Sequence, residues 1–136
     1  MTLQEFLARI TPHLIIYRKP EVAIDQCDFV SEAVRVAAKK FGVPLKIGSV
    51  TVNEIGHSVL FTNTEVIDFT LSQFDGHKKR KPFPFRCKFG SKLFNQVYGE
   101  FEENDNAWIW NKHDSPLLRT LLDACTVNTS RSKSRQ

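Results

Sequence analysis

The stretch that decides the fold is "GHSVLFTNTEVIDFT", residues 56–70. Two short segments rich in Val, Ile, Phe and Thr flank the polar pair at positions 63 and 64, a pattern typical of two strands joined by a tight turn. A two-residue turn makes His57 and Asp68 diagonal neighbours on one face of the hairpin, about 7–8 Å apart at the backbone. The hairpin therefore predicts a His57–Asp68 pair, whereas an odd-numbered loop would place the two on opposite faces.

Asp68 needs a partner because its neighbours are apolar. Burying a carboxylate between Ile67 and Phe69 is costly unless a basic group or backbone donors satisfy it. A salt bridge or an edge position facing water would serve equally well, so the histidine is one of several partners that the local sequence allows.

Upstream, "DQCDFVSEAVRVAAKKFG", residues 25–42, is the clearest helix of the chain. Asp25 is the expected N-cap, and Gly42 is the expected stop. Apolar residues recur at helical spacing from Val30 to Phe41, and Cys27 precedes that stripe in the first turn. We therefore expect a cysteine at the start of a helix that packs on the sheet.

These three residues supply the roles of a thiol hydrolase if the helix covers the face that carries the histidine. The positive end of a helix favours the thiolate of Cys27, His57 accepts its proton, and Asp68 orients the ring. The backbone N–H of Cys27 is an expected oxyanion donor, and Gln26 is a second candidate for that role.

The same residues resemble a known superfamily. A cysteine at the start of a long helix, then "HSVLF" (57–61), then "VIDFT" (66–70) followed by Gln73-Phe74, is similar to the small bacterial and phage members of the papain-like and transglutaminase-like cysteine hydrolases. The resemblance covers roughly residues 22–75. It implies a papain-like core with Cys27 as nucleophile, His57 as general base and Asp68 as the orienting carboxylate.

The rest of the chain completes an α+β pattern of N-terminal helices packed on an antiparallel sheet. Residues 2–17 predict an amphipathic helix that Pro12 interrupts, and residues 45–52 predict a further strand. Other expected elements are a short helix or strand in "GSKLFNQVYGEF" (90–101), a strand in "AWIW" (107–110) carrying Trp108 and Trp110, and a final helix from Ser115.

Length and composition fit one soluble domain. The 136 residues are 41% hydrophobic and 25% charged, which predicts a single papain-like domain over 1–126 and a disordered basic tail over 127–136. Three widely spaced cysteines favour neither a disulfide framework nor a structural zinc site. We expect no cofactor, no metal site and no membrane segment, and a cytoplasmic location or delivery into a host cell.

The expected partner is a protein or peptide substrate whose amide or thioester bond the cysteine attacks, as in a peptidase, amidase or glutamine deamidase. A scaffold that binds a protein without catalysis is the alternative, favoured by the short chain and by the lack of a matching glutamine well upstream of Cys27. The basic run "HKKRKPFPFRCK" (77–88) suggests a third hypothesis, nucleic-acid binding, although a solvated loop explains it more simply.

Overall fold

The computed structural model describes the backbone of residues 1–104 and 115–134, and the side chains of 1–104 and 115–126. The strand predicted at 107–110, with Trp108 and Trp110, lies outside the described residues. The elements are α1 (Leu3–Ile10), η1 (Thr11–His13), η2 (Ile15–Arg18), α2 (Pro20–Ala23), α3 (Cys27–Lys40), β1 (Lys46–Val52), β2 (Ile55–Phe61), β3 (Glu65–Asp68), η3 (Leu71–Gln73), β4 (Phe85–Lys88), α4 (Lys92–Val97), β5 (Gly99–Glu103) and α5 (Pro116–Ser134).

The N-terminal segment forms as its local signals predict. Thr2 and Glu5 make a reciprocal capping box, in which the Glu5 backbone N–H donates to Thr2 Oγ1 at 3.1 Å and the Thr2 N–H donates to Glu5 Oε1 at 3.2 Å. The α-helix then ends at Ile10, and the chain continues past Pro12 as two short 3-10 turns. The predicted interruption at Pro12 is confirmed.

Within the described residues, five strands form one antiparallel sheet in the order β4-β3-β2-β1-β5. The hairpin β2–β3 has the register of a two-residue turn, with Leu60 opposite Ile67 and Phe61 opposite Val66. The coarse α+β class is therefore confirmed, and so is the register on which the His57–Asp68 prediction depends.

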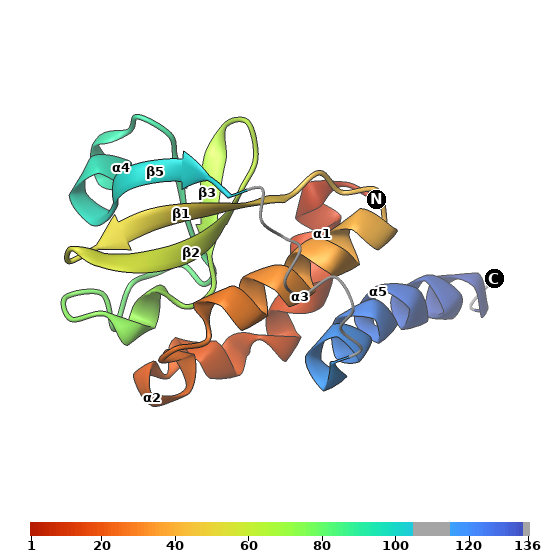
Figure 1. Ribbon diagram of the computed structural model, residues 1–136. Coiled ribbons are helices and arrows are strands. Elements are labelled where there is room, and N and C mark those ends of the chain that lie inside the picture. The colour runs from red at the N-terminus through yellow and green to blue at the C-terminus, as the bar shows by residue number, and fades with distance from the viewer. Residues whose placement is uncertain (105–114, 135–136) are drawn as a thin grey trace.

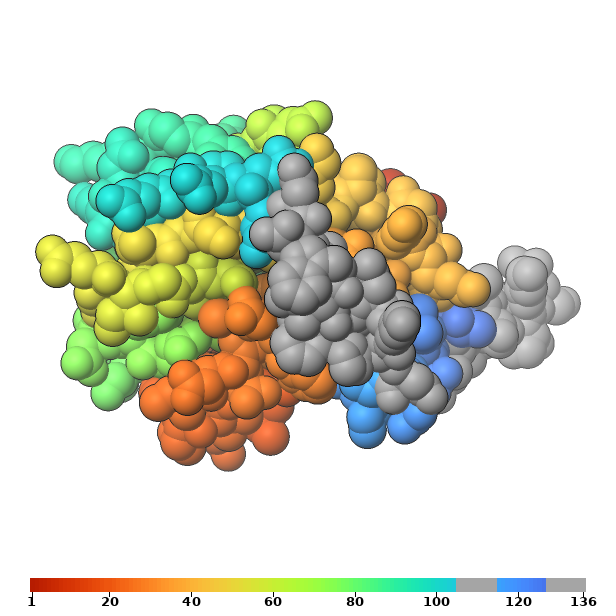
Figure 2. Space-filling model, viewed as in Figure 1, coloured from red at the N-terminus to blue at the C-terminus, as the bar shows by residue number. Residues whose placement is uncertain are grey.

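Alternation along the strands divides the buried side chains between the two faces of the sheet. Leu60 and Ile67 belong to a core shared with α1, α3 and α5, which cover that face (Figure 1). Val59 and Val66 belong to a second core on the other face, closed by the β4–β5 region and aromatic side chains. On the side shown in Figure 2, the helical N-terminal part of the chain (orange) lies directly against the strands (yellow to cyan).

The C-terminal half differs from the sequence prediction in two places. Residues 90–101 hold both elements considered there, because α4 ends at Val97 and β5 starts at Gly99. Helix α5 continues to Ser134, through most of the segment 127–136 for which composition predicted disorder. That segment contains no proline or glycine, the residues that most strongly stop a helix.

No helix in the part of the chain that the structure describes combines the length and the apolar character needed to cross a membrane.

Candidate active site

The hairpin brings the two predicted polar side chains together. His57 Nε2 lies 2.8 Å from Asp68 Oδ2, and both side chains are almost completely buried, at 0% and 1% exposure. Because Asp68 is diagonal to His57 across the ladder, this contact follows directly from the two-residue turn.

Two further donors hold the Asp68 carboxylate. The Tyr98 hydroxyl donates to Oδ2 at 2.7 Å, and the Thr70 backbone N–H donates to Oδ1 at 3.0 Å. Burial raises the pKa of the Tyr98 hydroxyl well above its usual value, and the neighbouring Asp68 charge raises it further. The phenol therefore stays protonated at neutral pH and acts as a donor. Buried carboxylates need such partners, and Asp68 has them on both oxygens.

The environment of His57 favours its protonated form. Burial alone would lower the pKa of the ring, but the charge and hydrogen bond of Asp68, together with the nearby thiol of Cys27, outweigh it and raise the pKa to about 10. Phe74 packs edge-on against the ring at 4.9 Å between centroids. The ring is thus fixed in orientation and is an imidazolium at neutral pH.

The second ring nitrogen is left open. His57 Nδ1 is the only buried side-chain nitrogen or oxygen in the described part of the chain without a hydrogen-bonding partner. Because Nε2 is held by Asp68, Nδ1 is the nitrogen available to exchange a proton with Cys27, whose thiol is close enough to raise the pKa of the ring. Unliganded active sites often have such loose contacts between nucleophile and base.

Cys27 is the first residue of α3 and is half-buried. The expected N-cap, Asp25, is wrong: Gln26 occupies that position and makes no capping hydrogen bond with its side chain. Asp25 instead adopts a left-handed turn conformation (φ 61°), and its N–H donates to Gln73 Oε1 at 3.4 Å. The first N–H groups of α3 therefore lack a side-chain cap, and such groups at a helix start are open donors.

The route by which the thiol meets the ring also differs from the prediction. The body of α3 covers the Leu60 face, whereas His57 and Asp68 lie on the opposite face. Strand β3 ends at Asp68, so β2 has no β3 partner beside His57, and Cys27 in the first turn of α3 is near enough to the ring to raise its pKa. Ser58 Oγ, which points to the helix side, donates to Asp28 Oδ1 and fastens this turn to β2.

Sequence reasoning missed Tyr98. Tyr98 lies between α4 and β5, where the sequence pattern predicted secondary structure but no functional residue. No local pattern links a tyrosine at this position to a carboxylate 30 residues earlier. The Gln73-Phe74 dipeptide, in contrast, was part of the resemblance, and both of its side chains contact the site or the loop before Cys27.

Substitution Tyr98→Phe tests how much that hydroxyl contributes. We expect the free energy of unfolding to fall by about 1–2 kcal/mol, because Asp68 loses a donor in a buried position that water does not replace. Chemical denaturation measures this change. Tyr17→Phe, which removes the hydroxyl of a half-buried tyrosine outside the site, is the control. Equal stability of the two variants would contradict a supporting role for Tyr98.

A cleft of about 370 Å³ adjoins the site and reaches Asp68, but neither Cys27 nor His57 lines it. Among the described residues no group of three or more His, Cys, Asp or Glu side chains is arranged to hold a metal ion.

No protein-family model, curated protein or solved structure matches this chain.

Proposed function

We propose that this chain is a papain-like cysteine hydrolase or transferase that acts on an amide or thioester carbonyl. The observation that carries the proposal is the buried His57 ring. One of its nitrogens is held by Asp68 at 2.8 Å, and the other is unpartnered beside Cys27. A nucleophile, a base and a group that orients the base are the three parts that such catalysis requires.

In the first half of the reaction the Cys27 thiolate attacks the carbonyl carbon and forms an S–C bond. The protonated His57 ring then gives its Nδ1 proton to the leaving amine, and the C–N bond breaks. An acyl group is left on Cys27, and the ring is neutral with Nε2–H still donated to Asp68. The raised pKa of His57 supports this starting state, since an imidazolium stabilises an adjacent thiolate.

In the second half a water molecule, or an amine in the transferase reaction, attacks the acyl carbon. His57 Nδ1 takes the proton from the attacking group, the S–C bond breaks, and the imidazolium–thiolate pair is restored. The tetrahedral oxyanion of both halves would be held by the backbone N–H of Cys27 at the start of α3, with the Gln26 amide as second donor.

The fold supports the papain-like part of the proposal at a coarse level. A helix that begins with the cysteine, a strand of an antiparallel sheet that carries the histidine, and a carboxylate on the next strand occur here in that order. Function depends on the site rather than on this architecture alone.

Acyl transfer from p-nitrophenyl acetate tests the proposal without knowledge of the natural substrate. We expect a burst of one p-nitrophenolate per chain, with the acetyl group located on Cys27 by mass spectrometry. In His57→Gln the acetylated form should lose its acetyl group about 100-fold more slowly, because the general base is missing. Cys87→Ser, which removes a buried thiol elsewhere, should leave the burst unchanged. A burst that persists in Cys27→Ala would contradict the assignment.

The second candidate is a protein-binding module without catalysis. The position of the adjoining cleft favours it, because Cys27 and His57 do not line that cleft. A folded wild-type protein that takes no acetyl group on Cys27 would point to this candidate.

A further inference from the structure

The positive charge of the chain is concentrated in the cleft beside Asp68. Six of the 19 Lys and Arg residues line it, against one of the 15 acids. The residues that line the cleft therefore carry a formal net charge of +5, and the rest of the chain carries −1, which together give the net charge of +4. Lining cations of this density select for an anionic ligand.

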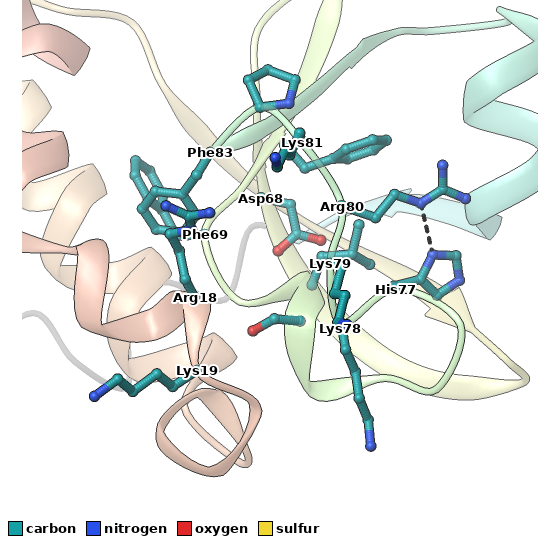
Figure 3. A pocket seen from close by; sticks show the side chains of 14 residues that line it. Arg18, Lys19, Asp68, Phe69, His77, Lys78, Lys79, Arg80, Lys81 and Phe83 are labelled. Carbon is teal, nitrogen blue, oxygen red and sulfur yellow. Dashed lines mark hydrogen bonds between the residues drawn. The ribbon is translucent and has the colours of Figure 1, made fainter.

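The cations come from two segments that face each other. Arg18 and Lys19 stand on one wall, at the end of η2, and the loop 78–81 forms the other wall (Figure 3). Asp68 lies between the walls, but its carboxylate is already used by His57, Tyr98 and the Thr70 N–H. The Asp68 carboxylate is thus already paired with these three groups and is not available to pair with the cations of the cleft.

Most of these cations have no internal partner. Arg18, Lys19, Lys79 and Lys81 make no ion pair with any described residue, and Lys78 contacts only the exposed Asp75. Arg80 differs from them, because internal contacts hold its side chain in one orientation.

Arg80 is held by two contacts. Its Nε donates to His77 Nδ1 at 3.1 Å, and its guanidinium lies 5.7 Å from the centroid of the Phe85 ring. Burial lowers the pKa of His77, so the ring is neutral and its Nδ1 accepts this bond. A preoriented arginine among exposed lysines is a suitable arrangement for carboxylates.

We propose that the cleft binds an acidic segment of the polypeptide on which Cys27 acts. This inference rests on the proposed function. The chain segment that carries Arg18 and Lys19 continues through α2 to Cys27, and the cleft residue Ser72 is followed by Gln73, which accepts a hydrogen bond from the N–H of Asp25. The two chain segments that line the cleft thus also lead toward Cys27, so a peptide bound in the cleft can extend toward the thiol.

A peptide fits these observations better than nucleic acid. Binding of single strands relies on aromatic rings exposed for base stacking. Here the Phe69 and Phe83 rings pack edge-to-face on each other at 5.6 Å, and Phe85 is buried under Arg80. The cleft therefore offers charge without a stacking platform.

Binding is measured on full-length Cys27→Ala by fluorescence anisotropy at low salt. The probes are a fluorescein-labelled peptide with six Glu residues, the same peptide with six Gln residues, and a ten-residue oligothymidylate. We expect the Glu peptide to bind and the Gln peptide not to bind. Lys79→Glu/Lys81→Glu should weaken binding at least tenfold. Lys88→Glu/Lys92→Glu, an equal charge change at exposed positions outside the cleft, should change it less than twofold.

Equal weakening by the two double variants would overturn the proposal, since net charge alone would then explain binding. Binding of the oligothymidylate but not of the Glu peptide would overturn it in favour of nucleic acid. The test is independent of catalysis: the Glu peptide can bind a protein whose Cys27 proves inert, and an active Cys27 can coexist with a cleft that binds nothing.

Discussion

Iodoacetamide at pH 7 should carboxamidomethylate Cys27 at least about 100 times faster than Cys87 or Cys125. The thiolate is the reactive form of cysteine, and Cys27 lies at the start of α3, close to the protonated His57 ring. Burial raises the pKa of Cys87 to about 11, with help from Asp68 and Glu65, so on the order of one thiol in 10,000 is ionised at pH 7. Burial also raises the pKa of Cys125.

Peptide mass spectrometry over a time course gives the three rates in one sample. His57→Gln should slow the labelling of Cys27 about tenfold or more, because it removes the positive charge beside the sulfur. Tyr17→Phe, which leaves the site intact, should not. If all three thiols react slowly and alike in folded wild-type protein, Cys27 is not an activated nucleophile.

Asp68→Asn should lower the pKa of His57 well below its value of about 10. Burial disfavours the charged ring, and the Asp68 charge is the largest of the effects that oppose it. The neutral ring would then be favoured at a lower pH than in the wild-type protein. Titration of the ring proton signals of His57 by NMR measures the shift. Cys27→Ala is the control, and it should lower the pKa less because the Asp68 pair remains.

The lowered pKa of His57 has a kinetic consequence. We expect Asp68→Asn to slow removal of the acetyl group from Cys27 by a factor of about 100 to 10,000, because the ring loses its orientation and becomes a weaker base. An unchanged His57 titration together with an unchanged rate would show that Asp68 does not act through the histidine.

The same raised pKa makes stability depend on pH. A group whose pKa is higher in the folded state contributes fully below its unfolded value, about 6.5, and this contribution disappears as pH rises toward the folded value. Unfolding free energies of Cys27→Ala, in which that thiol no longer titrates, should therefore decline above pH 6.5. The slope should be largely absent when Asp68→Asn is added.

The sequence by itself determined the features that depend on local periodicity and turn chemistry. The polar pair at 63 and 64 set the hairpin register, and that register alone puts His57 and Asp68 in contact. The capping box at Thr2 and the interruption at Pro12 also follow from neighbouring residues. Such features are predictable because the groups that interact lie within a few residues or on directly paired strands.

Only the tertiary structure decided which groups complete the site. Tyr98 reaches Asp68 across 30 positions, and Cys27 lies near His57 although the body of α3 covers the other face of the sheet. The cleft likewise joins positions 18–19 to the loop 78–81. These contacts depend on where β3 ends and how α3 lies over the sheet. Both are fixed by packing of side chains distant in sequence, which no local pattern encodes.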